Sequence, residues 1–541
     1  MIPFPSSIDP SDEAFQGQRA AMLDLVDRLH GLLKRAGDAS ERSRAAFEKR
    51  GALLPRERLA RLLDAGSPFL DLCNLAGYGM DEPDLDRSIP GGSQLAGIGF
   101  VSGVRCMVVV TDSGINAGAL TEAGNQKLMR CQEIAIENRL PFVHLVESAG
   151  ANLRQYRVEK FVRGGGIFYN LARLSAAGLP IVTVAHGPST AGGAYLLGMS
   201  DYVIMVRGRG KAFLAGPPLL KAATGEIATD EELGGAEMHA AVSGLTEYVA
   251  EDDEHAIATA RDVVAALDWN CGASIVSPPR PPREPALDLD ELAGAMVMDV
   301  RRRIDMREII ARLVDGSEWM DFKPDYGAAT LCGRGRIAGH AVGFISNNGP
   351  IDPAGAVKAT QFIQLCEQVG SPIVYLQNTT GFIVGRASEE AGMIKHGSKM
   401  VQALSNATVP QITIHCGASF GAGNFGMCGR GFHPRFCFSW PNARTAVMGG
   451  EQAATVMDIV ARQQAERRGT AVAEAQLAAQ KAEIIANFEK QASAFITSGL
   501  LLDDGVIDPR STRAVLAFVL ATCREAEARR PRPIQFGVAR G

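Results

Sequence analysis

Two glycine-containing turns are the stretches of this 541-residue sequence best suited to chemistry. The first, HGPSTAGGAY over 186–195, follows the apolar, β-branched run 179–185 and precedes a small-residue helix over 194–199. Such a run is typical of a buried strand in a parallel sheet. A turn from a buried strand into a helix directs free backbone N–H groups toward one point. These groups and the helix dipole favour an oxyanion there.

A second stretch, VPQITIHCGASFGAG over 409–423, repeats the first. In this repeat Gly192 and Gly193 return as Ala422 and Gly423. A single glycine pair is more often a packing turn, but recurrence of the whole pattern favours a shared role. We therefore expect one oxyanion-type turn in each half of the chain.

The repeat extends over most of the sequence. ARLLD at 60–64 returns as ARLVD at 311–315, and both are followed closely by Gly-Ser-x-aromatic-apolar-Asp. The pattern GxGxxxG at 97–103 returns at 333–339. Because the order of these landmarks is the same in both halves, the chain is predicted to be a duplicated domain.

Strands and helices are predicted to alternate before each turn. In the first half the predicted elements are strands over 106–111, 142–147 and 181–185 and helices over 125–138 and 167–177. This alternation predicts βαβ units, and hence α/β domains in which helices cover a mainly parallel sheet. Helical regions are also predicted over 16–64 and around 451–495.

The repeat also sets the predicted number of domains. Length alone would suggest roughly three to four domains, whereas the repeat favours two of about 250 residues each. Residues 278–285 hold five prolines in eight positions and predict a stiff, extended spacer. The sequence therefore predicts an N-terminal domain over 1–277, a proline-rich linker over 278–290 and a C-terminal domain over 291–541.

Composition limits the partners and the compartment. The net charge of −5 argues against a general nucleic-acid or anionic-membrane binder. The ten cysteines are scattered without a CxxC pair, which favours reduced thiols. No signal or transit peptide is recognisable in residues 1–15, and no apolar run approaches the ~20 residues of a membrane span. We therefore expect a cytoplasmic protein with neither nucleic acid nor membrane as a partner.

Other candidate chemistry is weaker. The segment 417–421 matches the G-x-S-x-G nucleophile elbow, but a hydrolase needs an acid and then a histidine after the serine. Only His433 follows Ser419, with no Asp or Glu between them, so the hydrolase reading fails. His186 and His415 are possible bases, although buried, hydrogen-bonded histidines are favoured. No His, Cys, Asp or Glu cluster has metal-ligand spacing, so no metal is assigned.

Basic residues give a second hypothesis for binding. Positions 154, 157, 160 and 163 fall three apart and share a helix face if the segment is helical. A phosphate-binding set would consist of Arg154, Arg157, Lys160, Arg163, Arg207, Arg209 and Lys211. A solvated charged face explains the same pattern equally well.

The residues thus supply two oxyanion-type turns and no convincing nucleophile, base or metal. Two such turns suit a transfer between two carbonyl-type partners, each passing through an enolate-like form. If one partner carries its own base, the protein need only position the reactants and stabilise the charge.

Several segments resemble the carboxyltransferase (β) subunits of biotin-dependent acyl-CoA carboxylases. These segments are FLAGPPLLKAATGE at 213–226, GAGNFGMCGR at 421–430, WPNAR at 440–444, VMGGEQAA at 447–454 and DDGVIDP at 503–509. The likeness spans nearly the whole chain and points to the methylcrotonoyl-CoA and geranyl-CoA carboxylase branch, in which MGGEQAA is characteristic. It implies two crotonase-like domains of the ClpP/crotonase superfamily in tandem. Acyl-CoA would bind the N-terminal domain, and biotin the C-terminal domain of a neighbouring subunit.

The resemblance also implies roles for individual residues. Gly192 and Gly193 would stabilise the thioester enolate, and the amides of Ala422 and Gly423 would hold the biotin ureido oxygen. In the family, carboxybiotin releases CO2 and the biotin anion removes the substrate proton, which fits the missing protein base. Acyl-CoA binding is implied for Ala191, Gly164, Gly165, Gly166, Ala215, Gly216 and Lys221. Biotin binding is implied for Gly421, Phe420 and Gly381.

The implied partners follow from what the sequence lacks. It has no ATP-binding P-loop and no Met-Lys-Met biotin-attachment signal, since Lys399-Met400 lacks the preceding methionine. We therefore expect a partner α subunit that carries biotin covalently and carboxylates it. The resemblance implies a homo-oligomeric β core, a hexamer within an α6β6 assembly. Biotin and a coenzyme A thioester are the expected cofactor and substrate, without a metal.

Two departures from the methylcrotonoyl pattern bear on the acyl group. Residues 116–127 are less bulky than in that branch, and 153–170 form a shorter segment with three successive glycines at 164–166. Both departures remove side-chain volume, which favours geranyl-CoA over 3-methylcrotonoyl-CoA. The alternative is that the glycines merely relax a loop. A crotonase-type hydratase or hydrolase, a decarboxylase-type carboxyltransferase and a non-catalytic scaffold subunit are the alternatives.

Overall fold

The chain folds into two compact units. The computed structural model describes residues 3–150, 157–269, 278, 280–299, 302, 304–469 and 474–539. Unit 1 comprises Met1–Leu29, Pro278–Ser498 and Leu502–Leu520, and unit 2 comprises His30–Ser277, Gly499–Leu501 and Ala521–Gly541. The division after residue 277 coincides with the predicted start of the linker. The two ends of the chain, however, belong to the opposite units from the predicted domains.

Unit 2 contains an eight-stranded sheet built from the first half of the sequence. Its strands are β1 (Leu70–Asp71), β2 (Gln94–Val101), β3 (Val104–Thr111), β4 (Phe142–Ser148), β5 (Ile181–Thr190), β6 (Tyr202–Val206), β7 (Lys211–Phe213) and β8 (Tyr248–Ala250). They are ordered β1-β2-β3-β4-β5-β6-β8, and β7 pairs with the end of β5. Strands β1 to β3 are antiparallel, and the remaining pairs are parallel.

Unit 1 repeats this arrangement with the second half of the sequence. Its strands are β9 (Met320–Asp321), β10 (Thr330–Ile337), β11 (His340–Asn347), β12 (Ile373–Thr379), β13 (Gln411–Phe420), β14 (Phe436–Ser439) and β15 (Arg444–Ala446). Their order is β14-β13-β12-β11-β10-β9, with β15 beside the end of β13. The register shift between β4 and β5 recurs between β12 and β13. These sheets confirm the predicted α/β class and the internal duplication.

Helices cover the two sheets. Those of unit 2 are α2 (Arg44–Lys49), α3 (Pro55–Leu62), α4 (Glu122–Glu137), α5 (Val158–Gly164), α6 (Gly166–Ala176), α7 (Gly192–Gly198), α8 (Pro217–Thr224), α9 (Asp230–Gly234), α10 (Ala236–Met238) and α11 (Asp253–Ala266). Those of unit 1 are α12 (Leu292–Ala295), α13 (Arg307–Leu313), α14 (Pro353–Gln368), α15 (Arg386–Glu390), α16 (Met393–Asn406), α17 (Ala422–Gly426), α18 (Gly450–Arg468) and α19 (Glu474–Ala492). Three more are α1 (Glu13–Glu41), α20 (Ala494–Gly499) and α21 (Thr512–Ala528). Strands β3 and β4 are buried at every position, the pattern of a sheet covered on both faces.

The main difference from the predicted elements is the length of β5. Periodicity predicts a strand over 181–185, but the structure continues it to Thr190. The extension pairs with β7 over residues 188–190 and 211–213. Because the partner strand β7 lies outside the local sequence of β5, periodicity does not reveal this pairing. The turn therefore begins only at Ala191.

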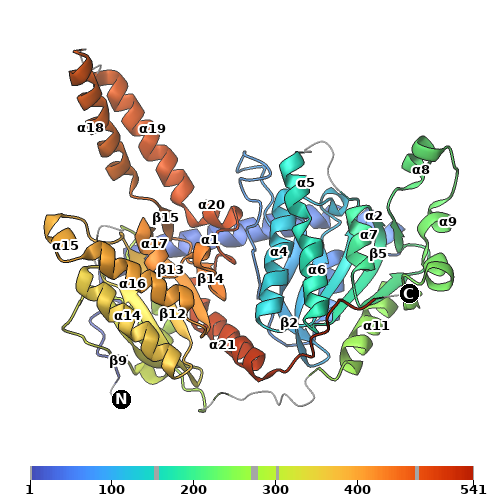
Figure 1. The fold of residues 1–541 in the computed structure, drawn as a ribbon, viewed down its shortest axis with the longest axis horizontal. Coiled ribbons are helices and arrows are strands. Elements are labelled where there is room, and N and C mark those ends of the chain that lie inside the picture. Colours follow the sequence, from blue (N-terminus) through green and yellow to red (C-terminus); the bar gives the residue numbers. More distant parts are fainter. Residues whose placement is uncertain are drawn as a thin grey trace. The chain divides into compact units, whose positions relative to one another are not determined.

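The region predicted to be helical around 451–495 forms α18 and α19, which pack against each other and project as a hairpin from the rest of unit 1 (Figure 1). Among the described helices, none combines the length and apolarity needed to cross a bilayer. The cysteines of the described ranges are buried and are not in disulfides, and Cys271 lies outside these ranges.

Candidate active site

The first turn connects β5 to α7 through Ala191. This residue has a φ of 52°, a left-handed conformation that costs a non-glycine residue roughly 1–2 kcal/mol. Its N–H donates to the carbonyl of Phe213 on β7, at 3.0 Å. The pairing of β5 with β7 therefore helps to hold the turn in this conformation.

Two backbone N–H groups of this turn are available to a ligand. The N–H of Ala194 donates to the carbonyl of Ala191 at 3.0 Å. The N–H groups of Gly192 and Gly193 have no acceptor among the described residues. Because the first N–H groups of a helix cannot bond within it and lie at its positive end, these two favour an anionic oxygen.

The second turn has the same hydrogen-bonding pattern. It connects β13 to α17 through Gly421, whose φ is 53° and whose N–H donates to the carbonyl of Ala446 on β15 at 2.9 Å. The N–H of Asn424 donates to the carbonyl of Gly421 at 3.2 Å. Those of Ala422 and Gly423 have no acceptor within the described ranges. Each half thus presents one pair of adjacent free donors.

Space at the second donor position is restricted in both turns. A Cβ atom at Gly193 would lie 3.3 Å from the Cβ of Ser148. A Cβ atom at Gly423 would lie 2.8 Å from the Cα of Gly381. The first of these contacts is tight and the second is a clash with backbone.

The first donor position is roomier. A Cβ atom at Gly192 would lie 3.5 Å from the Cζ of Phe168, which is an ordinary contact. The equivalent residue of the second turn is Ala422, which carries such an atom. The second donor of each pair is therefore the more restricted position.

A hydroxyl group supports each turn from the neighbouring strand. In unit 2 the Oγ of Ser148 donates to the carbonyl of Gly118 at 3.0 Å and accepts the N–H of Gly150 at 3.2 Å. Ser148 lies at the end of β4, directly against Gly193. Its two hydrogen bonds fix the wall on which the turn rests.

Unit 1 repeats this support with a threonine. The Oγ1 of Thr379 donates to the carbonyl of Gly349 and accepts the N–H of Gly381, both at 3.2 Å. The sequence expectation named Gly381 but missed Ser148 and Gly150. A sequence signal for both residues exists, because Ser-x-Gly at 148–150 recurs as Thr-x-Gly at 379–381 after the equivalent strand.

Comparison with known proteins supplies the family. A family model described as the carboxyl transferase domain matches residues 47–535. The chain belongs to the carboxyl transferase family. It is 46% identical to a probable biotin-dependent acyl-coenzyme A carboxylase beta2 subunit of Mycobacterium tuberculosis, over 95% of this chain and 96% of the relative. It is 43% identical to the biotin-dependent 3-methylcrotonyl-coenzyme A carboxylase beta1 subunit of the same organism, over 93% and 94%.

A solved structure agrees with these relatives. The beta subunit of Pseudomonas aeruginosa geranyl-CoA carboxylase superposes with a TM-score of 0.93, at 49% identity and with 100% of both chains covered. These relatives confirm the family and the enzyme class predicted from sequence motifs.

The three successive glycines of this carboxyl transferase lie at the junction of α5 and α6. A Cβ atom at Gly164 would lie 3.3 Å from the Nδ2 of Asn125, and one at Gly166 would lie 2.7 Å from the Sδ of Met129. Both neighbours belong to α4, so these two glycines allow the junction to approach that helix closely. Gly165 is exposed, and a Cβ atom there would lie 3.3 Å from the carbonyl oxygen of Val162 on α5.

Apolar side chains lie beside the first turn. Phe168 and Leu120 are within 3.8 Å of the Cβ position of Gly192. The ring of Phe168 makes an edge contact with that of Tyr195, at 5.9 Å between centroids. Sequence reasoning did not identify Phe168 or Leu120 as the side chains nearest to this turn.

The remaining expected site residues lie on segments next to the turns. Ala215 and Gly216 connect β7 to α8, and Lys221 is exposed on α8. Phe420 is buried as the last residue of β13. A Cβ atom at Gly381 would lie 3.4 Å from the carbonyl oxygen of Phe420, which places Gly381 beside the second turn.

The two histidines are buried structural groups, as favoured from the sequence. The Nδ1 of His186 lies 2.9 Å from a carboxylate oxygen of Asp253, and that of His415 lies 3.0 Å from the Oγ of Ser439. Burial lowers the pKa of both imidazoles to about 4, so both are neutral at neutral pH. Neither is suited to removing a proton from a bound substrate.

Most of the basic residues proposed for phosphate binding are ion-paired. The paired ones are Arg157 with Glu159, Lys160 with Glu122, Arg207 with Glu237 and Glu251, Arg209 with Asp253, and Lys211 with Asp230 and Glu231. Arg154 lies outside the described residues. These pairs favour a charged surface over a phosphate site.

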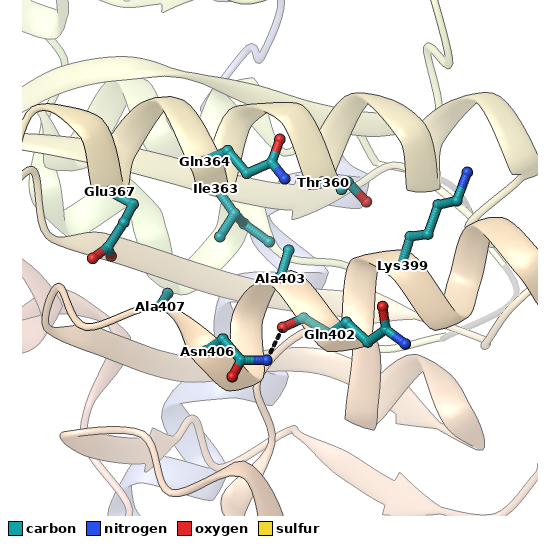
Figure 2. Close-up of a pocket in the computed structure, with 9 residues that line it drawn as sticks. All are labelled: Thr360, Ile363, Gln364, Glu367, Lys399, Gln402, Ala403, Asn406 and Ala407. Carbon is teal, nitrogen blue, oxygen red and sulfur yellow. Dashed lines mark hydrogen bonds between the residues drawn. The ribbon is translucent and has the colours of Figure 1, made fainter.

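A separate groove of about 430 Å³ lies between α14 and α16 (Figure 2). Its lining includes Gln364, Glu367, Lys399 and Asn406, and the amide of Asn406 bonds to its own helix. No residue of either turn lines it. In the described part of the chain, no group of three or more His, Cys, Asp or Glu residues is placed to hold a metal ion.

Proposed function

We propose that this carboxyl transferase moves CO2 from carboxybiotin, carried by a partner α subunit, to the γ carbon of a branched α,β-unsaturated acyl-CoA. The observation that carries the proposal is the pair of free, adjacent N–H groups in each of two equivalent turns. A reaction with two oxyanions needs two such sites. A crotonase-type hydratase would need one active half and a carboxylate base.

We assign the first turn to the acyl-CoA and the second to biotin. Gly192 and Gly193 donate to the thioester oxygen as the enolate forms, and donors fixed in advance stabilise that charge without reorganisation. Ala422 and Gly423 donate to the ureido oxygen of biotin, a role supported by their two adjacent N–H groups, which have no acceptor among the described residues. When bound, biotin supplies the carboxyl group and the base that the turns lack.

Further contacts complete the proposed sites. Acyl-CoA is proposed to pass Ala191, the glycines at 164–166 and the β7–α8 connection with Ala215, Gly216 and Lys221. Biotin is proposed to contact Phe420, Gly421 and Gly381. We also propose a β-subunit hexamer within an α6β6 assembly in the cytoplasm, because the relatives are beta subunits of biotin-dependent carboxylases.

The protein is expected to be inactive alone. Purified chain incubated with geranyl-CoA, ATP and bicarbonate should form no product, because the carboxyl donor is carried by another subunit. Addition of a biotin-bearing α subunit should restore carboxylation, measured by fixation of labelled bicarbonate. Robust carboxylation by the chain alone, without biotin, would refute the proposed division of labour.

Geranyl-CoA is the substrate we favour, and 3-methylcrotonoyl-CoA is the second candidate. The 49% identical structure is a geranyl-CoA carboxylase subunit, and the three glycines at 164–166 carry no side chains at the junction of α5 and α6. The 43% identical M. tuberculosis relative acts on 3-methylcrotonyl-CoA, which keeps the shorter substrate in contention.

Replacing Gly165 by phenylalanine tests the acyl group. Each methylene in an apolar pocket contributes roughly 1–3 kcal/mol, so filling the space should lower activity on geranyl-CoA at least ~10-fold while sparing 3-methylcrotonoyl-CoA. Gly165 suits the test better than Gly166, whose Cβ would first displace Met129. Kinetics with both substrates should be measured on wild type, Gly165→Phe and a Gly165→Ala control. A parallel loss on both substrates, or a wild type that prefers the shorter one, contradicts geranyl-CoA but not carboxyl transfer.

A further inference from the structure

Each unit carries an aspartate at the end of the repeated Gly-Ser-x-aromatic-apolar-Asp segment, a feature that carboxyl transfer does not explain. Asp71 lies on β1 opposite Gly97 of β2, and Asp321 lies on β9 opposite Gly333 of β10. The strand pairing is therefore the same in both units. These aspartates occupy equivalent positions on the edge strands of the two sheets.

A buried lysine accompanies each aspartate. Lys127 and Lys358 lie on the equivalent helices α4 and α14, and both side chains are almost wholly buried. Lys127 lines the same cavity as Asp71, and in unit 1 the charge of Asp321 acts on the pKa of Lys358. The duplication has therefore preserved an aspartate–lysine arrangement under the edge of each sheet.

An arginine completes the arrangement, and here the two units differ. Arg307 of unit 1 is bonded to Asp321, at 2.6 Å between Nε and Oδ2. Arg56 occupies the equivalent position in unit 2. Within the described residues, neither Arg56 nor Asp71 has an ion-pair partner within 4.0 Å. The arginine and the aspartate are therefore paired in unit 1, whereas their equivalents in unit 2 are not.

A cavity of about 190 Å³ occupies the opened position in unit 2. A cavity of roughly 10–15 Å³ holds one water, so this cavity has room for a molecule much larger than water. Arg56, Asp71, Asp112 and Lys127 line it. Asp71 remains exposed because its side chain faces this space.

One residue that lines the cavity has a buried polar atom without a partner among the described residues. Gln94 is 4% exposed, and its Oε1 has no hydrogen-bond partner among the described residues. Its main-chain oxygen, by contrast, accepts the Nζ of Lys127 at 2.9 Å. A buried acceptor without a donor is costly, which indicates that an occupant supplies one.

The remaining lining is apolar. Leu33 and Ala36 of α1 line one part of the cavity, and Leu95 and Ile115 line others. An occupant therefore meets an arginine without a partner, acceptors on Asp71 and Gln94, and a hydrocarbon wall. An anionic group suits the arginine and a cationic donor suits the acceptors.

We propose that this cavity of unit 2 binds a small zwitterion, an α-amino acid with an aliphatic side chain. The carboxylate bonds to the guanidinium of Arg56. The ammonium group donates to Asp71 and to the Oε1 of Gln94, and the side chain packs on Leu33 and Ile115. The site is separate from the residues assigned to acyl-CoA and biotin, so the inference does not depend on the proposed function.

Binding is tested on the full-length chain by isothermal titration calorimetry with L-leucine as the probe. 4-Methylpentanoate lacks the ammonium group, isopentylamine lacks the carboxylate and glycine lacks the side chain. We expect saturable binding of L-leucine, an increase in the melting temperature, and roughly tenfold to hundredfold weaker binding of each charge-deleted analogue. Glycine should also bind more weakly. If the folded wild type does not bind L-leucine, the cavity holds only water and the proposal is overturned.

The duplication supplies a matched control. Arg56→Gln should abolish L-leucine binding, whereas Arg307→Gln changes the equivalent residue of unit 1 and should leave the affinity unchanged. Arg56 is exposed and unpaired among the described residues, so its replacement should preserve folding. Undiminished binding by Arg56→Gln, or equal loss in both variants, contradicts the assigned site. The analogue series on wild type gives an answer that depends on neither variant.

Discussion

Replacing Gly193 by valine is expected to lower carboxyl transfer by about 10²–10³-fold while the protein remains folded. Loss of one oxyanion donor costs roughly 2.7–4 kcal/mol of transition-state stabilisation. A Cβ atom at this position would already lie 3.3 Å from that of Ser148, and the branches of valine add atoms beyond it. The turn must shift, which moves the N–H of residue 193 away from the enolate oxygen. The rate of the reconstituted enzyme measures the effect.

Two further variants separate donor geometry from general damage. Gly192→Ala places a methyl group where 3.5 Å is available to Phe168, so its loss should be much smaller. Gly423→Val should be as damaging as Gly193→Val, because the backbone of Gly381 lies only 2.8 Å from the added atom. Circular dichroism should show the same fold in all three. Near-normal turnover by folded Gly193→Val would reject the role of the first turn.

The repeat explains why much of the site was predictable. Gly193 and Gly423 are both glycine because a Cβ atom would meet a neighbouring strand or loop, and this requirement leaves a mark in the sequence. Ala191 leaves no such mark. It takes the left-handed conformation that Gly421 takes at the equivalent position, so residue type alone does not reveal the geometry.

Features that depend on distant segments were not predictable. Glu147 precedes Ser148 on β4, and nothing in the local sequence distinguishes it from other strand residues. In the structure its carboxylate bonds to Arg50 and Arg58. The assignment of each chain end to the unit formed by the other half was also not predictable, because the packing of residues 1–29 in unit 1 depends on tertiary contacts. Periodicity reports which face of an element is apolar, and not which partner covers it.

A buried ionic network below the first turn leads to the second large expected effect. Asp253 at the start of α11 is 2% exposed and lies 3.1 Å from the Nε of Arg58, which is 1% exposed. Its carboxylate also lies 2.9 Å from the Nδ1 of His186 and 3.0 Å from a guanidinium nitrogen of Arg209. It further accepts the N–H of Leu53 at 2.7 Å. One carboxylate thus compensates several groups that would otherwise be buried without an acceptor.

Asp253→Ala is expected to lower the free energy of unfolding by about 3–5 kcal/mol, because it removes a buried partner of Arg58 and leaves this guanidinium with Glu147 as its remaining carboxylate among the described residues. Urea denaturation measures the loss. The adjacent Glu254 provides the control, since its pair with Arg61 is exposed on both sides and Glu254→Ala should change stability little.

The pH dependence of Asp253→Asn identifies the charge as the cause. Burial alone would raise the pKa of Asp253, but its bonds to His186 and Arg58 hold that pKa well below its usual value. A carboxylate with a depressed pKa stabilises the fold above its unfolded pKa of about 3.9, and this contribution is lost as the pH falls. The stability difference between wild type and Asp253→Asn should therefore be full near neutral pH and shrink below about pH 4. A difference that stays constant down to low pH would mean that packing, and not the charge of Asp253, accounts for its contribution to stability.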